Sequence, residues 1–514
     1  MAIQDGAIQN AGSGQGPPIL DRVVRFFPPN ETSAFLVGGY LRDLLISRAK
    51  SLDPTHDLDI AVTGDVERIA RDLAGDLGGS TVPLSPSRGV FRVVVPGTRE
   101  AESGDAGEDK PWTIDLTAFS GDIQEDLSRR DFCVDAMALA IHDRDKDDWL
   151  DRIIDPFHGR QDLVKKRIRA VSPSIFREDP GRLLRSVRLA SQLGFALDPE
   201  TVNLVRAEAH RVSLVSAERI RDEFLAILAM VNAKGYLVIL DRLDLLCRVI
   251  PELEATKGVE QPVVHYWDVW GHILHCVETA ELVTQGHQNS PVFMFVPWTP
   301  ESQAYFNEDV AGGYSRRTVL KLAALFHDIA KPQTKAIDET GRTRFLGHSE
   351  LGATMAAQRL TQLRLSSRAV AMVSRMVEHH LRPGNMSQGA ELPTARAIHR
   401  YFRDVDDVAV DTLYLALADH LAAKGPNLSM EQWSAHARMI GHILEAGSEQ
   451  PESAGPARLI TGHDLIAHLG LEPGPLVGRI LETVIEAQAL GEIHTREEAL
   501  ALAEQTVPEL RARE

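Results

Sequence analysis

The spacing of apolar and polar positions changes character along the chain. Short alternating runs, FLV at 35–37, DLDIAV at 57–62 and WTIDLTAF at 112–119, have the period of two that predicts β-strands. Between the first two runs, Gly38-Gly39 predicts a tight turn, and the helical spacing of YLRDLLI at 40–46 predicts a helix after it. The second half shows long helical periodicities with few strands. The sequence therefore predicts an α+β head with a mixed sheet of the five-stranded type, followed by all-α domains.

Three carboxylates lie in these alternating runs. Asp57 and Asp59 are two residues apart, so both side chains face one way from the strand. Asp115 lies in the third run, which could pair with the first carboxylate strand. Neighbouring carboxylates repel one another unless a hard cation lies between them, and Mg²⁺ prefers such oxygen ligands. Two ions held in this way would activate an attacking hydroxyl and steady a leaving pyrophosphate. The alternative for an isolated Asp-x-Asp is a polar edge strand with solvated acids.

The glycine turn before the first helix is a candidate phosphate site. Backbone amides of Gly38 and Gly39 at a helix start can hold a phosphate, and Arg42 in the first turn could reach a triphosphate. The alternative is that Arg42 and Asp43 belong to surface ion pairs of the i, i+4 type. Residues 96–111, rich in Gly, Glu and Asp, predict a mobile loop beside the site or a disordered insertion.

The segment FREDPGRLLRSVRLA at 176–190 carries chemistry of its own. Asp179 and Arg182 are three residues apart at the start of a predicted helix and share one face of it. A carboxylate accepts and a guanidinium donates, so the pair matches an edge with an amino donor beside a ring-nitrogen acceptor, which cytosine and adenine both present. Such a pair could select CTP and ATP without a template. The alternative is an ordinary helix salt bridge between Glu178 and Arg182.

Six blocks follow one another in a fixed order over roughly residues 30–230. They are GGYLRD, DLDIAV, IDLTAF, DLSRRDFCVDAMAL, IDPFHGRQDL and FREDPGRLLRSVRLASQLGF. In this order they resemble the class II tRNA nucleotidyltransferase and bacterial poly(A) polymerase family, which implies a head with the polymerase-β-like nucleotidyltransferase fold. The resemblance implies that Asp57 and Asp59 are the catalytic metal-binding pair, with Asp115 beside them, and that Arg130 and Asp131 contact the ribose. The nucleotide-binding residues would be Gly38, Gly39, Arg42, Asp43, Arg130, Asp131, Asp179, Arg182, Arg185 and Arg188.

The chain departs from the family pattern at two places. Ala118-Phe119-Ser120 follow Asp115 where an arginine is expected nearby, and Asp135 stands where an asparagine is frequent. These departures bear on the finer contacts with the triphosphate and leave the class of enzyme unchanged.

Composition and charge narrow the choice of partners. The 514 residues are 44% hydrophobic and 25% charged with a formal net charge of −18, which argues against a general nucleic-acid coat. Between Leu163 and Arg211, however, ten Lys or Arg accompany five Asp or Glu, a basic stripe that would suit an RNA acceptor end unless its arginines lie on solvated helix faces. Three scattered cysteines imply neither a disulfide framework nor a zinc ribbon. The sequence shows no signal peptide and no long apolar run, so we expect a cytoplasmic protein without a membrane partner.

Histidines and acids recur on successive predicted helices of the second half, where they could bind a divalent metal. They are His272, His327, Asp328, His348, His380 and Asp419. Their order resembles the HD metal-dependent phosphohydrolase domain over about residues 260–425, with His348 and His380 as the additional ligands. This resemblance implies hydrolysis of phosphomonoesters or cyclic phosphates by a metal-activated water. The alternative is a domain that keeps these ligands and serves only to dock RNA.

We expect five segments in the chain. They are a flexible tail at 1–24, the nucleotidyltransferase head at 25–157, a helical neck for base selection and RNA binding at 158–255, the HD domain at 256–430 and a C-terminal helical tail at 431–514. Residues 285–317 have no periodicity and no assigned role. The C-terminal tail resembles the helical piece of HD-bearing tRNA nucleotidyltransferases, where it would contact the tRNA elbow or serve as a packing helix pair.

The predicted activity is template-independent addition of CMP and AMP, from CTP and ATP, to tRNA 3′ ends. Mg²⁺ would act in the head, and a divalent metal of unassigned identity in the HD domain. Relatives that add only CC, only A or a poly(A) tail share the same blocks, so these activities are the first alternative. In a different class, the HD domain would be the main enzyme and the head would only bind a nucleotide.

Overall fold

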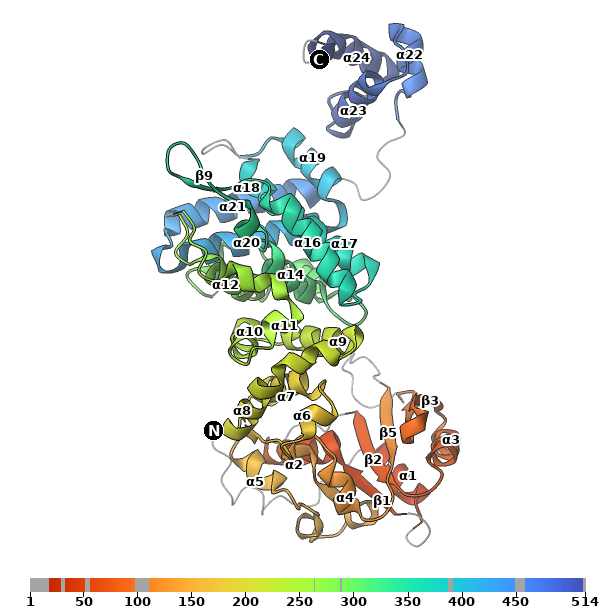
Figure 1. The fold of residues 1–514 in the computed structure, drawn as a ribbon. Helices are drawn as coiled ribbons and strands as arrows, with labels where there is room; N and C mark the ends of the chain where they lie inside the picture. Colours follow the sequence, from red (N-terminus) through yellow and green to blue (C-terminus); the bar gives the residue numbers. More distant parts are fainter. Residues whose placement is uncertain are drawn as a thin grey trace. The chain divides into compact units, whose positions relative to one another are not determined.

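The computed structural model describes residues 18–28, 33–50, 56–97, 111–262, 264–286, 289–386, 392–448 and 458–511 (Figure 1). The chain forms two compact units, the first with Met1–Ile227 and Ile239–Val249, the second with Leu228–Val238 and Ile250–Glu514. Most of the loop expected at 96–111 lies outside the described residues. Among the helices in the described ranges, none has the length and apolar character needed to cross a bilayer. The finer division into five segments stays a prediction.

A six-stranded mixed sheet is the centre of the first unit. Its strands are β1 (Ala34–Val37), β2 (Asp57–Val62), β3 (Ser80–Ser85), β4 (Val90–Val95), β5 (Trp112–Ala118) and β6 (Ala138–Ala140). They lie in the order β3-β4-β5-β2-β1-β6, with β2 and β5 parallel and the other neighbours antiparallel. The mixed sheet is confirmed, but the expected strand number of five was wrong. The sixth strand, β6, has only three residues and is too short to give an alternating signal.

The two faces of the sheet divide the apolar side chains from the acids. Leu58, Ile60 and Val62 of β2 are buried in one core with side chains of α1 (Pro18–Phe26) and α3 (Val66–Leu77). The alternate residues Asp57 and Asp59 therefore project from the other face, as the period of two requires. Residues 18–24, which the sequence assigned to a polar tail, form most of α1, because Leu20 and Val23 are fully buried in that core.

Helices accompany the sheet in the head and form the neck, of which Leu228–Val238 belong to the second unit. The head contributes α2 (Gly38–Lys50) and α4 (Ile123–Ser128), and the neck contributes α5 (Gly159–Val164), α6 (Ile175–Glu178), α7 (Arg182–Leu193), α8 (Pro199–Glu208), α9 (Ala217–Ala229), α10 (Ala233–Arg242) and α11 (Leu246–Val249). Two-residue strands β7 (Arg167–Ile168) and β8 (Ala196–Leu197) pair in parallel. The single helix start expected for Glu178, Asp179 and Arg182 was wrong. A break at Pro180-Gly181 separates α6 from α7, and Asp179 lies in it with extended backbone.

The second unit is helical, as the sequence predicted. Its helices are α12 (Val269–Val283), α13 (Pro300–Asn307), α14 (Arg316–Phe326), α15 (Lys331–Thr334), α16 (His348–Gln362), α17 (Ser367–His379), α18 (Arg382–Asn385), α19 (Ala395–Val405), α20 (Ala409–Lys424), α21 (Met430–Ser448), α22 (Gly462–Leu469), α23 (Pro475–Ala489) and α24 (Arg496–Arg511). Helix α14 is buried almost all round, and it packs on α12, α17 and α20 (Figure 1). A hairpin of β9 (Lys335–Ile337) and β10 (Thr343–Phe345) precedes α16, and α22–α24 have a core of their own.

Candidate functional site

The three predicted carboxylates meet on one face of the head sheet. Asp59 of β2 and Asp115 of β5 are direct partners in the parallel register, and Asp57 lies two residues along β2. The Thr113 hydroxyl donates a hydrogen bond to Asp57. Desolvation raises the pKa of the half-buried Asp59, although the positive charge of Arg130 opposes the shift. Adjacent carboxylates that lose water on folding are suited to a hard divalent cation, so these residues fit Mg²⁺.

The glycine turn lies directly beside Asp59. The backbone amide of Tyr40 donates to Asp59 Oδ2 at 3.3 Å. Gly38 has a φ of +63°, and a Cβ built on it would lie 2.9 Å from both Arg130 Nη1 and Asp59 Oδ2. Glycine is therefore needed here for its backbone conformation and for the space that the guanidinium and the carboxylate occupy.

Arg42 has two carboxylate partners in this structure. Arg42 is 6% exposed. Its Nη1 donates to Asp135 Oδ1 and its Nε donates to Asp43 Oδ1, both at 2.7 Å. Asp135, the family departure noted above, is thus the buried counter-ion of Arg42. The Nη2 atom of Arg42 lies beside the glycine turn, 3.3 Å from where a Cβ on Gly39 would stand, and a contact of Arg42 with a triphosphate stays a prediction.

The arginines among the other candidate nucleotide-binding residues form ion pairs with acids of the head or the neck. Arg185 Nε lies 2.7 Å from Asp131 Oδ2, and Arg130 Nη2 donates to Asp126 Oδ2 at 3.3 Å. Arg188 Nε donates to Glu223 Oε2 at 2.5 Å. The structure therefore brings Arg185 and Asp131 together, a pairing that their separation in sequence did not indicate.

Asp179 and Arg182 each have protein partners in this structure, and their predicted contact with a base stays a prediction. Arg219 of α9 donates through Nη1 and Nη2 to the two carboxylate oxygens of Asp179, both at 2.9 Å. Arg182 Nη2 donates to the carbonyl of Arg129 at 2.7 Å, and its Nη1 is 3.7 Å from Glu178 Oε2. The helix salt bridge is therefore present as a weak contact. No sequence motif marked Arg219.

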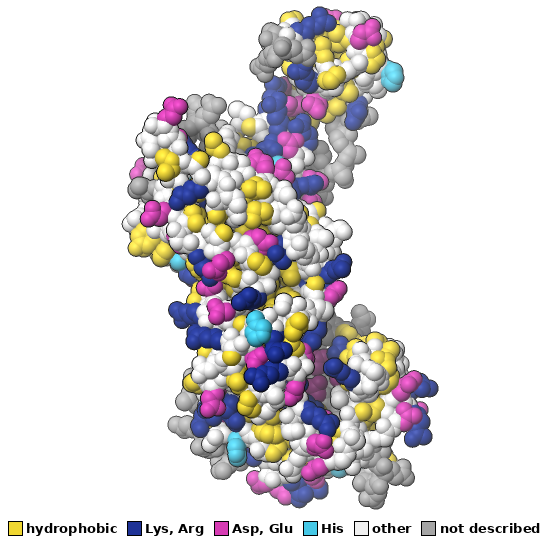
Figure 2. Space-filling view, viewed as in Figure 1, with side chains coloured by type: hydrophobic (Ala, Val, Ile, Leu, Met, Phe, Trp, Pro, Cys, Tyr) yellow, Lys and Arg dark blue, Asp and Glu magenta, His cyan; other side chains and the backbone are white. Residues whose placement is uncertain are grey.

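The basic stripe of the neck is largely neutralised by acids. Arg177 and Arg211 both pair with Glu208, and Arg167 pairs with Asp162 and Asp198. On the face shown in Figure 2, Lys and Arg side chains are interspersed with Asp and Glu, without one continuous basic surface. Much of the positive charge that the sequence places in the neck is therefore paired with carboxylates of the same chain.

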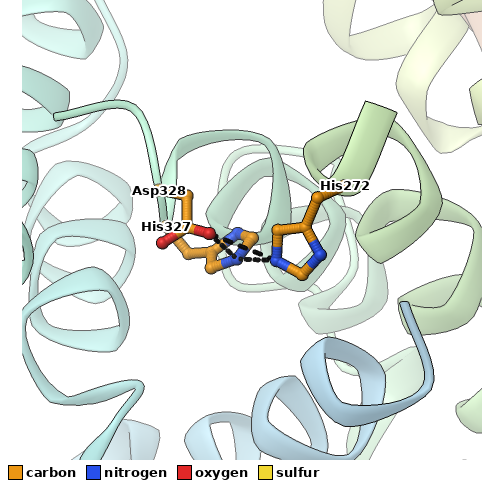
Figure 3. A group of neighbouring side chains, drawn as sticks. All are labelled: His272, His327 and Asp328. Carbon is orange, nitrogen blue, oxygen red and sulfur yellow. Dashed lines mark hydrogen bonds and ion pairs between the residues drawn. The ribbon is translucent and has the colours of Figure 1, made fainter. Parts of the chain in front are cut away.

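The second unit gathers all six predicted HD residues into one buried cluster. His272 comes from α12, His327 and Asp328 follow α14, His348 begins α16, His380 follows α17, and Asp419 lies in α20. Figure 3 shows the rings of His272 and His327 and the carboxylate of Asp328 pointing toward one another. The spacing on successive helices therefore predicted a real convergence of side chains.

Asp328 belongs to two groups of potential ligands. Its Oδ2 lies 3.2 Å from the Nε2 atoms of both His272 and His327. Its Oδ1 lies 3.3 Å from Nε2 of His348 and 3.9 Å from Nε2 of His380. Within each group, all the candidate ligand atoms lie within 4.8 Å of one another.

Asp419 completes the first group. Its Oδ1 is 3.0 Å from His272 Nε2 and 3.8 Å from His327 Nε2. The geometry of two imidazoles and two carboxylates is one that divalent metals accept.

Backbone carbonyls fix the direction in which three of the imidazoles face. Nδ1 of His327 donates to Ala324 O at 2.8 Å, that of His348 to Phe345 O at 2.6 Å, and that of His380 to Val377 O at 2.7 Å. With Nδ1 as the donor, each Nε2 keeps a lone pair for a metal. This arrangement of the tautomers supports a metal centre.

The pKa values of three members of the cluster are shifted from their ordinary values. Although burial works in the opposite direction, His327 and Lys331 hold the pKa of Asp328 well below its ordinary value. Burial lowers the pKa of His272, but the hydrogen bonds that its ring donates to Asp328 and Asp419 outweigh burial and raise the pKa. Burial and the charge of His327 lower the pKa of His380 to about 4.

Two further side chains border this cluster and were missed in the sequence. Lys331 Nζ lies 2.6 Å from Asp328 Oδ2 and donates to Gln261 Oε1 at 2.6 Å. The His265 ring meets that of His272 edge to face at 5.3 Å. The position of Lys331 three residues after Asp328, one helical turn on, was a signal that could have been used.

Four family models match the chain in order. They are the poly A polymerase head domain at 34–169, a probable RNA and SrmB-binding site of polymerase A at 194–257, the HD domain at 272–424 and a putative tRNA nucleotidyltransferase domain 2 at 457–503. The A-adding tRNA nucleotidyltransferase of Deinococcus radiodurans is 33% identical over 94% of this chain and 97% of its own. The CC-adding tRNA nucleotidyltransferase of Thermus thermophilus is 34% identical over 93% of this chain and 94% of its own.

Solved structures share the fold at low identity. The Thermotoga maritima CCA-adding enzyme complexed with tRNA matches with a TM-score of 0.56 at 18% identity and covers 95% of each chain. A CCA-adding enzyme with ATP matches with a TM-score of 0.58 at 17% identity, covering 97% of this chain and 95% of that one.

The mixed sheet with its row of carboxylates defines a nucleotidyltransferase. The chain belongs to the tRNA nucleotidyltransferase family, in the group that carries an HD domain after the neck. The resemblance, the fold class and the type of enzyme predicted from the sequence are thereby confirmed.

Proposed function

We propose that this protein adds C and A nucleotides, from CTP and ATP, to the 3′ ends of tRNA with Mg²⁺ in the head. The observation that carries the proposal is the row of Asp57, Asp59 and Asp115 on β2 and β5, in the same unit as the base-selecting candidates Asp179 and Arg182. Relatives similar over nearly their whole length are named as tRNA nucleotidyltransferases, which supports tRNA as the acceptor. The cytoplasm, where tRNA is matured, is the proposed compartment.

In this proposal the protein supplies binding and orientation. Bound Mg²⁺ would assist the attack of the tRNA 3′-hydroxyl on the α-phosphate and the departure of pyrophosphate. Asp57 and Asp59 would hold the ions, with Asp115 as the third carboxylate. Arg130, whose Nη1 lies beside the glycine turn, would face the nucleotide.

Base selection in the proposal depends on the neck. Asp179 would accept from the exocyclic amino group of cytosine or adenine, and Arg182 would donate to the ring nitrogen. Both side chains have protein partners in the nucleotide-free structure, Arg219 for Asp179 and the Arg129 carbonyl for Arg182. Nucleotide binding would therefore exchange these contacts.

A second candidate is addition of only part of the CCA end. The relatives of Deinococcus radiodurans and Thermus thermophilus, which match over 93% or more of this chain, are named A-adding and CC-adding. Relatives named CCA-adding enzymes match over shorter parts, such as 44% of this chain for that of Lactobacillus gasseri. The poly(A)-tailing alternative has the support of two matches named after polymerase A, the head domain and the probable RNA and SrmB-binding site.

Primer extension distinguishes these candidates. The protein is incubated with tRNA ending before CCA and with tRNA ending in CC, each with CTP alone, ATP alone or both. Addition of CCA to the first tRNA supports the leading proposal, CC alone or A alone supports a partial enzyme, and long A tracts support a poly(A) polymerase. Incorporation of neither nucleotide would refute the transferase proposal.

We also propose that the HD domain is a metal-dependent phosphohydrolase for phosphomonoesters or cyclic phosphates. The shared position of Asp328 between two ligand groups supports this, since the cluster can hold one or two divalent ions. Asp59→Ala should abolish nucleotide addition and keep hydrolysis, whereas His327→Ala should do the reverse. If only His327→Ala removes the biological activity, the HD domain is the main enzyme. A wild-type protein without hydrolytic activity would leave the domain as an RNA-docking body.

A further inference from the structure

Arg92 is a cation of the transfer site that no sequence motif marks. It lies on β4, where the register places it directly opposite Asp115 of β5, and Asp115 in turn lies opposite Asp59 of β2. Cross-strand neighbours project from the same face of a sheet, so the guanidinium extends the carboxylate row by one position. The Arg92 side chain is 39% exposed, which leaves it room to move.

The contact between Arg92 and Asp115 occupies the oxygens that a metal ion would need. Nε and Nη2 of Arg92 donate to Oδ1 and Oδ2 of Asp115 at 2.7 and 2.8 Å. This two-bond geometry is the strongest form of an arginine–carboxylate contact. A divalent ion takes carboxylate oxygens directly as ligands, so metal binding at Asp115 competes with Arg92.

The charges of the loaded site would give the released guanidinium a new partner. Divalent ions repel it, whereas a triphosphate offers pairs of anionic oxygens that match its fork of donors. A guanidinium stays protonated in proteins, so Arg92 keeps its positive charge and its attraction for phosphate after it leaves Asp115.

We propose that Arg92 is a positioning residue that exchanges partners during nucleotide loading. It holds Asp115 in the metal-free enzyme, yields that carboxylate to the divalent ions, and turns to the phosphates of the nucleotide. Arg92 thus supplies a cation near Asp115 from β4. The end of β5 and the residues after it, Ala118-Phe119-Ser120, carry no cation. This inference rests on the proposed nucleotidyl transfer.

Two equilibrium measurements on the full chain test the exchange without turnover. The first is Mn²⁺ binding without nucleotide, followed by electron paramagnetic resonance, in which only the binding that Asp59→Ala abolishes is counted. The second is binding of α,β-methylene-CTP at saturating Mn²⁺ by calorimetry. Arg92→Gln is compared with wild type and with Arg71→Gln, which removes the same charge from an exposed arginine of α3 paired with Glu67 at 3.0 Å.

The expected result is a pair of opposite changes. Arg92→Gln should bind Mn²⁺ several-fold more tightly, because Asp115 is free, and the nucleotide about tenfold more weakly, because a charge-assisted contact is lost. Arg92→Lys, with one point charge and no fork, should show a smaller loss of nucleotide affinity. Arg71→Gln should match wild type in both.

Any other combination overturns the inference. If Arg92→Gln weakens both affinities, Arg92 only supports the fold around Asp115, and if nucleotide affinity is unchanged, it does not contact phosphate. Should Arg92→Gln fail to fold, Arg92→Lys decides by the same two readouts. If wild type itself shows no Asp59-dependent Mn²⁺ binding and no nucleotide binding, the proposed function falls together with this inference. A wild type that binds both, beside an unchanged Arg92→Gln, refutes this inference alone.

Discussion

Asp59 of β2 and Asp115 of β5 face each other across the parallel strand pair of the six-stranded sheet. These acids come from segments 56 residues apart in sequence, and the register places them side by side. The strand register therefore creates the carboxylate row, which exists only in the folded sheet.

Replacement of Asp59 should abolish the proposed nucleotide transfer. Asp59→Ala removes a half-buried carboxylate of the proposed metal site, and we expect nucleotide addition to fall on the order of a thousandfold or more. Incorporation of labelled CTP into tRNA measures the loss, and a thermal melt checks the fold. Thr113→Val, which removes only the hydroxyl bonded to Asp57, is the milder control. Equal losses in both variants would contradict a specific role for Asp59.

Gly38 should not tolerate a side chain. Its φ of +63° disfavours other residues, and a Cβ would lie 2.9 Å from Asp59 Oδ2. We expect Gly38→Ala to lower transfer about a hundredfold by displacing the carboxylate. Gly75→Ala is the matched control, since Gly75 lies inside α3 with no atom within 4 Å of its added Cβ. That variant should be fully active and more stable by about 0.4–1 kcal/mol. Similar activities of the two variants would show that the turn is not tightly constrained.

Arg219 should influence the choice of base through Asp179. Its two bonds orient the carboxylate, so Arg219→Ala should lower the preference for CTP over UTP about tenfold or more. The readout is the ratio of kcat/KM for the two nucleotides, because a purely structural defect would lower both values alike. Arg221→Ala, at an arginine of α9 paired with Asp222, should keep the wild-type ratio.

The metal-free HD cluster should lose stability as pH rises. Acidic partners raise the pKa values of His272 and His348 against the effect of burial. An imidazole with a raised folded-state pKa contributes stability that is full below the unfolded value of about 6.5 and is lost above it. With a chelator, we therefore expect the melting temperature to fall as pH rises above about 6.5, by roughly 2–4 °C for each kcal/mol of stability lost.

A bound metal ion should remove much of the pH dependence of the melting temperature, because it takes the place of the protons on His272 and His348. Circular dichroism melts with chelator and with Mn²⁺ compare the two states. In the chelated protein, His272→Gln should flatten the profile, whereas His442→Gln, outside the cluster, should not. A profile that is unchanged in His272→Gln would assign the pH dependence to other groups.

The sequence predicted those features that depend on local spacing. The alternation around Asp57 and Asp59 was sufficient for the strand and for the face of the acids, and the resemblance to the HD domain named six side chains that lie together in the structure. Metal binding by these side chains stays a prediction. The sequence did not predict the features that depend on pairing between segments far apart in the chain. The run VFRVVV contains Arg92 but does not show that β4 pairs with β5 and brings Arg92 to Asp115. The sequence likewise does not show that Asp135 is the buried partner of Arg42.

Local breaks limited the prediction in a second way. Pro180-Gly181 ends α6 before α7 begins, and a Cβ at Gly181 would come within 2.3 Å of Arg219 Nη2. Helical spacing alone extended one helix across this point. The need for glycine at position 181 becomes clear only from the structure, because Arg219 passes close to the backbone there.

Because both oxygens of Asp328 are engaged, one with His272 and His327 and the other with His348 and His380, the two halves of the cluster are thermodynamically coupled. An ion in one half would draw on the charge of the shared carboxylate and repel a cation in the other half, so the second ion would bind more weakly than the first. The HD unit would then fill over a wider range of metal concentration than two independent sites, while the head, with its separate carboxylate row, would bind its ions independently.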